Sequence, residues 1–250
     1  MLQQLKILCR QGKQTIPNVS EVHLHQNFRG RPVISNAVVE PSAVAEICPV
    51  SAMEIAPLRI DLCKCTFCGL CARVFPEKIR FTNDYRLASN DRERLLIVEG
   101  KDRAVTLHFE KRRPEIRDLF KKSLKLRQVS AGGDNSVEME LNACSNVNFD
   151  MGRFGIEFVA SPRHADGIVV TGPLSGNMAE ALQICYDAVP EPKILVLAGV
   201  DALSGGIFAG SKALDRSFLN KYPVDLYIPG NPPHPLTIIN GLLDLIAANK

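Results

Sequence analysis

The sequence predicts two domains of different class: an α+β domain, followed by an α/β domain built on a parallel sheet. Three observations support this division. Six of the eight cysteines lie before residue 72. The first half of the chain is basic and the second half is acidic. Short apolar runs that alternate with helical stretches begin only after about residue 137, a pattern typical of α/β domains. The 250 residues are enough for two ordinary domains.

The charge distribution and one glycine-rich stretch indicate where the boundary between the two domains lies. Residues 1–135 carry 23 Lys and Arg against 15 Asp and Glu, whereas residues 136–250 carry 7 against 12. The stretch "AGGDNS" at 131–136 is polar and rich in glycine, which indicates a break between elements. We therefore predict domains at 1–130 and 131–250, with no internal repeat evident in either.

Composition limits the class of protein. No apolar run reaches the roughly 18 residues that a membrane span needs. The expected compartment is the reducing cytoplasm, where clustered cysteines bind metal more often than they form disulfides. Cys9 and Cys185 stand apart from the cluster, and we expect both to be buried apolar residues.

Two elements are predicted late in the first domain. "RLLIVEG" and "AVTLHFE" flank a Gly-Lys-Asp turn and indicate a β-hairpin over 94–110. Apolar residues at helical spacing behind Pro114 indicate an amphipathic helix over 114–129. Residues 111–127 hold eight Lys or Arg against two acids, so this helix is either a solvated surface or a contact for an acidic protein or anionic lipid. Nucleic acid is not expected, because no stacking aromatic residues are interleaved.

The second domain is predicted from five strands and two helices. The strands are expected in "VEMELNA" (137–143), "GIEFVAS" (155–161), "DGIVVTGP" (166–173), "KILVLAGV" (193–200) and "VDLYIPG" (224–230). The helices are expected at 176–189 and 235–250. In parallel sheets the loops after the strands form the binding crevice. Those loops are 144–148, 172–176, 199–206 and 230–235.

The motif that carries chemistry is "CKCTFCGLCARVFP" at 63–76. Cys65, Cys68 and Cys71 have the spacing C-x2-C-x2-C that opens an iron–sulfur ligand run. The bacterial pattern continues with a Cys three residues later, followed by Pro. Here Phe75 precedes Pro76, so the fourth thiolate must come from elsewhere.

Cys48, followed by Pro49, supplies that thiolate. In chains with two clusters, the Cys-Pro cysteine of one run ligates the cluster of the other run. Counting back from Cys48 gives Val38, Pro41 and Val44, none of which binds iron. All four ligands of one cluster are therefore absent, while all four ligands of the other remain.

The segment thus resembles a two-cluster ferredoxin domain that has kept one [4Fe–4S] site on Cys48, Cys65, Cys68 and Cys71. "FRGRP" (28–32) and "PEKI" (76–79) are similar to the ferredoxin subunits of hydrogenase and complex I systems. The alternative is a zinc site on the same thiolates, although zinc sites usually pair two separated C-x2-C elements. Cys63 is expected to be a free thiol, because its spacing to Cys65 does not fit the pattern.

Three blocks in the second domain resemble the small subunit shared by membrane-bound [NiFe] hydrogenases and complex I. They are "RFGIEFVASPRHADGIVVTGP" (153–173), "PEPKILVLAGVDALSGGIF" (190–208) and "PVDLYIPGNPPHP" (223–235). The resemblance implies a flavodoxin-like α/β fold with a cluster in the strand-end loops, next to a large subunit. It also implies that Arg163 and His164 contact the cluster site or that large subunit; the alternative is an ordinary surface loop.

The ligand positions of this domain depart from the family. Cys144 matches the first ligand, but Val147, Asp201 and Asn231 stand at the other three. Clusters are held by thiolates, with His as an occasional substitute. We therefore expect no cluster in the second domain. No catalytic residue stands out in either domain, so the chain is not expected to be catalytic alone.

The sequence as a whole favours an electron-transfer subunit of a multi-subunit oxidoreductase. Its partners would be a large-subunit homologue and other redox subunits, with a membrane-arm contact through the basic helix. The second hypothesis is a structural or assembly subunit whose cluster lies off the electron path. We expect the protein in the cytoplasm, with a peripheral position on the cytoplasmic face of the membrane left open.

Overall fold

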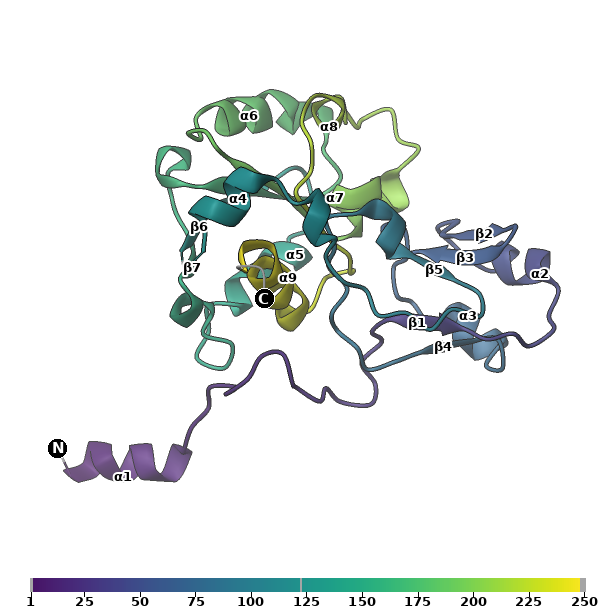
Figure 1. Cartoon of the computed structure of the whole chain (residues 1–250), viewed down its shortest axis with the longest axis horizontal. Coiled ribbons are helices and arrows are strands. Elements are labelled where there is room, and N and C mark those ends of the chain that lie inside the picture. The colour runs from purple at the N-terminus through teal and green to yellow at the C-terminus, as the bar shows by residue number, and fades with distance from the viewer. Residues whose placement is uncertain (1, 122, 248–250) are drawn as a thin grey trace.

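The computed structural model describes residues 2–121 and 123–247. The chain folds into an N-terminal part with small antiparallel sheets and a C-terminal part with one parallel sheet (Figure 1). Both predicted classes, α+β and α/β, are confirmed at this level.

The C-terminal sheet has five parallel strands in the order β10-β9-β8-β6-β7. Its strands are β6 (Leu124–Ser130), β7 (Ile156–Phe158), β8 (Gly167–Thr171), β9 (Ile194–Ala198) and β10 (Leu226–Ile228). Every residue of β8 and β9 is buried, because both faces of the sheet are covered. Such strands appear in sequence as continuous apolar runs, and these are the strands whose positions were predicted best.

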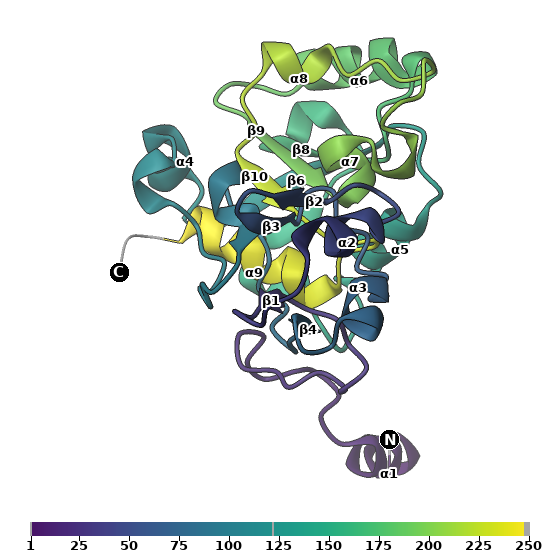
Figure 2. The ribbon, with the colours of Figure 1, turned by 90° about the vertical axis from the view of Figure 1, so that its right-hand side faces the viewer.

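Helices cover both faces of this sheet. They are α5 (Ser136–Ala143), α6 (Gly176–Asp187), α7 (Val200–Ser204), α8 (Phe218–Lys221) and α9 (Pro235–Ile246). Ten of the twelve residues of α9 are buried, since it packs against β10, α4 and α5 in the middle of the molecule (Figures 1 and 2).

Two sequence predictions beside this sheet are wrong. The predicted helix over 114–129 is a short helix α4 (Pro114–Leu119) followed by the strand β6, and the predicted strand over 137–143 is the helix α5. Leu124 and Leu126 are buried while Lys125 between them is exposed, which is the alternation of a strand. The parallel sheet therefore begins at Leu124, ahead of the predicted boundary after residue 130. The continuous basic helix does not exist.

The predicted hairpin over 94–110 is also wrong. Strand β5 (Leu96–Val98) pairs with β3 (Leu58–Asp61), which in turn pairs with β2 (Met53–Ile55). The stretch expected to form the second arm carries no strand, although Val105 and Leu107 are buried. Short 3-10 turns η1 (Arg92–Leu95) and η2 (Phe109–Lys111) flank this region.

The cysteine-bearing region is a duplicated unit that the sequence analysis did not detect. The chain runs β1 (Pro32–Ile34), α2 (Pro41–Glu46), β2, and then β3, α3 (Leu70–Val74), β4 (Ile79–Phe81). The inner strands β2 and β3 pair antiparallel, and so do the outer strands β1 and β4. The two halves thus follow the same order of elements, strand–helix–strand, around a shared core.

One hydrophobic core joins the two parts of the chain. Ile34, Leu58 and Cys71 of the N-terminal part belong to the same cluster of buried side chains as Val170 and Leu197 of the parallel sheet. The opposite face of the sheet packs against α9 in a second cluster. The N-terminal part also meets the edge strand β10 directly, since Ser89 and Tyr227 exchange backbone hydrogen bonds at 3.1 and 2.8 Å.

The chain begins outside these cores. Helix α1 (Leu2–Gln11) stands apart from the body, and the arm that follows it runs back along the C-terminal part (Figures 1 and 2). The Ile16 N–H donates to the carbonyl of Asn148 at 2.9 Å, and Asn240 Nδ2 donates to the carbonyl of Val19 at 2.9 Å. Cys9 lies in α1 and is exposed, so the prediction that it is buried is wrong.

A buried ion pair ties the segment before β6 to the segment before β10. Arg113 donates from Nε and Nη2 to the two carboxylate oxygens of Asp225, at 2.8 and 2.9 Å. The Asp225 side chain is 5% exposed and that of Arg113 is 34% exposed. We predict that Arg113→Ala lowers the free energy of unfolding by about 2–4 kcal/mol, because it leaves a buried carboxylate without its cation.

Urea titration followed by circular dichroism measures this loss. Arg103→Ala serves as the matched control, since Arg103 is exposed and its loss should change stability by no more than about 0.5 kcal/mol. Equal stability of the two variants would contradict the prediction.

Candidate functional site

Four cysteines line one cavity in the N-terminal part. They are the predicted ligands Cys48, Cys65, Cys68 and Cys71. The rest of the wall is almost entirely apolar. It is formed by Ile47, Pro49, Val50, Ala52, Met53, Ile60, Thr66, Gly69, Leu70 and Phe81. Two segments about twenty residues apart in the chain therefore meet around a single space.

Local backbone structure aims these sulfurs at the cavity. Cys48 follows α2, and the Ala52 N–H donates to its Sγ at 3.3 Å. The Phe67 N–H donates to Cys65 Sγ at 3.4 Å. Gly69 has a φ of +74°, and a Cβ there would lie 2.9 Å from the Arg29 side chain. A glycine is thus required where the cysteine loop turns into α3.

Burial sets the protonation of these thiols. Burial, together with a smaller contribution from the neighbouring cysteines, raises the pKa of Cys65 to about 12 and that of Cys71 to about 11. Desolvation disfavours the charged thiolate, so a metal that binds here must supply the compensating charge. Cys68 is the exposed member of the four.

Cys63 points elsewhere. It is buried and is absent from the lining of the cysteine cavity. Its N–H donates to Asp61 Oδ1 at 2.8 Å, and Asp61 pairs with Arg92 at 3.1 Å. Burial is the main reason that the pKa of this thiol is raised. Cys48 rather than Cys63 therefore completes the set of four.

Side chains without metal-binding atoms occupy the equivalent positions of the other half of the duplicated unit. Val44 is fully buried in the shared core, and Phe75 packs against that core. Pro41 begins α2, and Val38 is exposed. This other half of the duplicated unit is thus stabilised by hydrophobic packing.

In the C-terminal part, four residues stand at the positions of the family's cluster ligands. Each of the four has a different environment. The Cys144 thiol is buried in the second core cluster and donates to the carbonyl of Glu140 at 3.2 Å. Val147 is 60% exposed. The pKa of Asp201 is raised by burial and by the nearby carboxylates of Asp134 and Glu138. Asn231 lies in the cavity between the two parts of the chain.

Glu138 is a residue that the sequence analysis missed. It is 4% exposed, and its carboxylate accepts a hydrogen bond from Thr171 Oγ1 at 2.5 Å. It lies in α5, which was expected to be a strand, so no signal in the sequence placed it at the strand ends. The result is an acidic group near Asp201, where the family places a thiolate.

Arg163 and His164 lie at the opposite edge of the sheet. Both lie in the 3-10 turn η4 (Pro162–His164), and they line a cavity together with Lys125, Asp166 and Pro192. Those neighbours stand at or just before the starts of β6, β8 and β9. Because the strands are parallel, this edge is remote from the loops that follow them. The expectation that this pair contacts the cluster site of the second domain is wrong.

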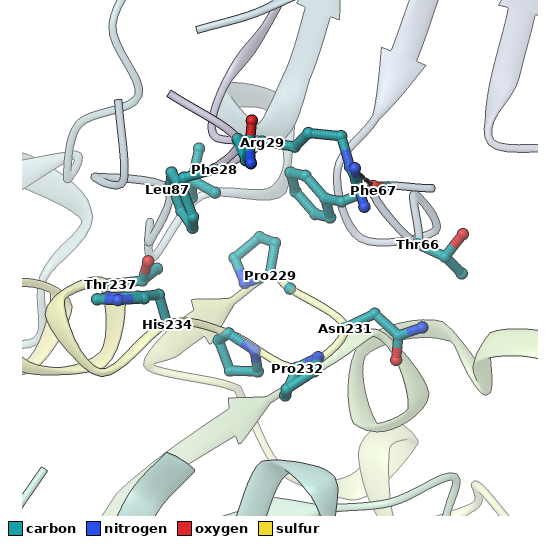
Figure 3. A pocket seen from close by; sticks show the side chains of 13 residues that line it. Phe28, Arg29, Thr66, Phe67, Leu87, Pro229, Asn231, Pro232, His234 and Thr237 are labelled. Atoms are coloured by element: carbon teal, nitrogen blue, oxygen red, sulfur yellow. Dashed lines mark hydrogen bonds between the residues drawn. The ribbon is translucent and has the colours of Figure 1, made fainter. Parts of the chain in front are cut away.

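A second cavity lies between the two parts of the chain (Figure 3). One wall carries Phe28, Arg29, Phe67 and Leu87, and the other carries Pro229, Asn231, Pro232 and His234. Arg29 Nε donates to the carbonyl of Phe67 at 2.5 Å. The loop that holds Cys65 and Cys68 therefore faces the loop after β10.

His234 anchors this second wall. Its ring meets the rings of Phe28 and Phe149 edge-on, with centroids 5.4 and 5.7 Å away. Nδ1 accepts from the Leu236 N–H at 3.2 Å and caps α9. Burial lowers the pKa of the imidazole, which favours the neutral form.

Together, the fold and the site define a class of protein: an α/β unit with a parallel sheet, extended at its N-terminus by a duplicated unit that presents four cysteines to one cavity. Residues 135–245 match the family model described as NADH ubiquinone oxidoreductase, 20 Kd subunit. The C-terminal region of the chain belongs to this family. The four cysteines that line the N-terminal cavity lie outside the matched residues.

Individual relatives each match about half of the chain. A probable membrane-bound hydrogenase subunit of Pyrococcus furiosus is 33% identical over 135 residues, which are 54% of this chain and 81% of the relative. An NADH-quinone oxidoreductase subunit of Heliobacterium modesticaldum is 44% identical over 110 residues, 44% of this chain and 63% of that one. A solved chain from an archaeal membrane-bound sulfane sulfur reductase is 31% identical and has a TM-score of 0.44 over 50% of this chain and 70% of its own length.

We predict that alkylation of the reduced, metal-free chain at pH 8 ranks the thiols. Cys9 and Cys68 are exposed and should react first. Cys63, Cys65 and Cys144 should react slowest, because burial raises the pKa of Cys63 and brings those of Cys65 and Cys144 to about 12. Only about one in ten thousand of such groups is a thiolate at pH 8, and the thiolate is the nucleophile.

Peptide mapping by mass spectrometry after timed iodoacetamide treatment gives the ranking. The same chain in denaturant is the control, since all its thiols then react at similar rates. Equal rates for Cys65 and Cys68 in the folded chain would contradict the structure.

Proposed function

We propose that this chain is an electron-transfer subunit of a multi-subunit oxidoreductase of the hydrogenase or complex I type. In this proposal, Cys48, Cys65, Cys68 and Cys71 hold one [4Fe–4S] cluster. The observation that carries it is the meeting of these four thiols around one apolar cavity.

The geometry favours a cluster over a zinc ion. Zinc draws four ligands to about 2.0–2.3 Å from one point. Within residues 2–121 and 123–247, no three His, Cys, Asp or Glu side chains converge in a way that would hold a single metal ion. The four cysteines instead line one apolar cavity, and their spacing, C-x2-C-x2-C with a distant Cys-Pro, is the ligand pattern of a cubane.

The order of elements supports a ferredoxin-like unit. Each half of the duplication places an x-Pro pair after its helix: Cys48-Pro49 follows α2, and Phe75-Pro76 follows α3. The ligand crossing between the two halves brings Cys48 to the side of Cys65, Cys68 and Cys71. One half of the unit keeps its cavity, and the other is filled by Val44 and Phe75.

The chain's own residues would tune the site. A bound cluster supplies one-electron redox chemistry. The N–H groups of Ala52 and Phe67 donate to the sulfurs of Cys48 and Cys65, and such hydrogen bonds stabilise negative charge on the ligands and raise the potential. The apolar wall excludes water, and Cys68 marks the edge nearest to solvent.

The C-terminal part would act as a docking scaffold for a large-subunit homologue. Family membership supports this, because the relatives are named as subunits of membrane-bound hydrogenase and of NADH-quinone oxidoreductase. Exposed apolar side chains also lie in the loops after its first helix and after β9: Val147, Ile207 and Phe208 are each at least 46% exposed. Among the described residues, no helix is long and apolar enough to cross a bilayer. We place the chain in the cytoplasm, at the cytoplasmic face of a membrane complex.

A structural or assembly role is the second candidate. The replacement of family ligands by Val147, Asp201 and Asn231 favours it, because the electron path of the relatives would then be interrupted in this part. A redox titration separates the two functions. A cluster that cycles reversibly supports electron transfer, whereas a cluster that is lost on reduction or never reduced supports the structural role.

We predict about four iron atoms and four sulfides per chain after anaerobic purification. Cys48→Ala should lower the iron content well below this value and remove the electron paramagnetic resonance signal of the reduced cluster. Cys63→Ala should leave both unchanged, because its thiol faces Asp61 and Arg92 rather than the cavity.

Iron and sulfide analysis with low-temperature resonance spectra tests this pair of variants. Loss of iron in Cys63→Ala together with retention in Cys48→Ala would refute the ligand set. Stoichiometric zinc in place of iron would refute the cluster.

A further inference from the structure

Helix α1 is amphipathic and has no partner among the residues that the structure describes. None of its residues is buried, and Leu2, Leu5, Ile7 and Leu8 are between 51% and 78% exposed. At 100° per residue, Leu2, Leu5, Leu8 and Cys9 fall within one arc of about 120°. A contiguous apolar stripe on a protein surface marks an interaction site.

The polar side of the same helix carries a single sign of charge. Lys6 and Arg10 lie one turn apart on α1, and Lys13 follows its end. No Asp or Glu occurs before Glu21. A protein groove would need only the apolar anchors, whereas uniform positive charge next to an apolar stripe suits an anionic lipid surface.

The helix also needs a surface in order to form. It has ten residues, and isolated helices shorter than about 12–15 residues are marginal in water. Burial of the apolar stripe in the headgroup region would supply the missing packing. We propose that α1 binds the surface of an anionic bilayer, with its apolar stripe inward and Lys6, Arg10 and Lys13 among the lipid headgroups.

The arm after α1 fixes which side of the protein faces the bilayer. Ile16 is held by the Asn148 carbonyl at 2.9 Å, and its own carbonyl accepts from Arg153 at 2.5 Å. The five residue steps from Gln11 to Ile16 span at most about 18 Å. The body is therefore tethered close to the membrane, on the side of the segment between α5 and β7. This replaces the expected contact through residues 111–127.

A single tryptophan tests the proposal directly. The chain contains no Trp, so Leu8→Trp gives a reporter without background. The full chain, with or without metal, is mixed with vesicles of phosphatidylcholine alone or with one quarter phosphatidylglycerol. We expect a blue shift of the emission and co-sedimentation with the anionic vesicles at low salt, and loss of both at high salt. Ile184→Trp, exposed on α6, should show no shift.

The charge requirement is tested in the same assay. Each cation near an anionic surface contributes about fivefold to binding, so Lys6→Glu with Arg10→Glu should weaken it at least about 25-fold. The matched control is Arg103→Glu with Lys212→Glu, two exposed residues on the body, which should stay within about twofold. All four substitutions leave the fold intact, as the far-ultraviolet circular dichroism of the variants verifies.

Three results would overturn the proposal. They are no shift of the α1 reporter with anionic vesicles, equal binding to neutral vesicles, and unchanged binding of the Lys6→Glu, Arg10→Glu variant. A shift that appears with rising protein concentration and without lipid would assign the stripe to a second copy of the chain instead. Because metal is not needed, these outcomes are independent of the cluster assignment.

Discussion

The structure depends on one hydrophobic core that side chains of the parallel sheet and of the duplicated cysteine unit share. Val170 and Leu197 of the sheet share a core with Ile34 and Leu58 of that unit. This burial holds the Cys65–Cys68 loop opposite the loop after β10, where the family places a cluster ligand and this chain places Asn231. The two parts therefore behave as one body, and the position of the cysteines follows from the packing of side chains far from any metal.

The elements that could be predicted are those whose sequence pattern fits only one type of secondary structure. The buried strands β8 and β9 are runs too short for a helix and too apolar for a loop. Cys48 could be assigned because ligand crossing in duplicated units leaves no other thiol with a Pro after it. By contrast, residues 124–130 were predicted to belong to a helix but form a strand, and residues 137–143 were predicted to be a strand but form a helix. In each, apolar residues recur at intervals compatible with both periods, and only pairing of β6 with β7 and β8 decides between them.

The candidate site shows which features cannot be predicted from the spacing of cysteines in the sequence. Spacing indicated which cysteines meet, but it did not show that Cys63 turns toward Asp61 and Arg92, because that depends on the packing of η1. Likewise, Arg163 and His164 were associated with the strand-end loops by resemblance, whereas the path of the chain from β7 to β8 carries them to the other edge. In the C-terminal part, the loss of thiolates is accompanied by the buried Glu138 and by Cys144 turned into the core. Of the four matched positions, only Cys144 lies in the core, whereas Val147 is exposed and Asn231 lines the cavity between the two parts of the chain.

The half-filled duplication limits how the proposed cluster could exchange electrons. Val44 and Phe75 fill one half, and Cys68 is the exposed cysteine of the other half. A carrier with two clusters takes up an electron at one and releases it at the other. With the single cluster proposed above, the donor and the acceptor would share one site, so they would dock in turn or approach Cys68 from adjacent sides.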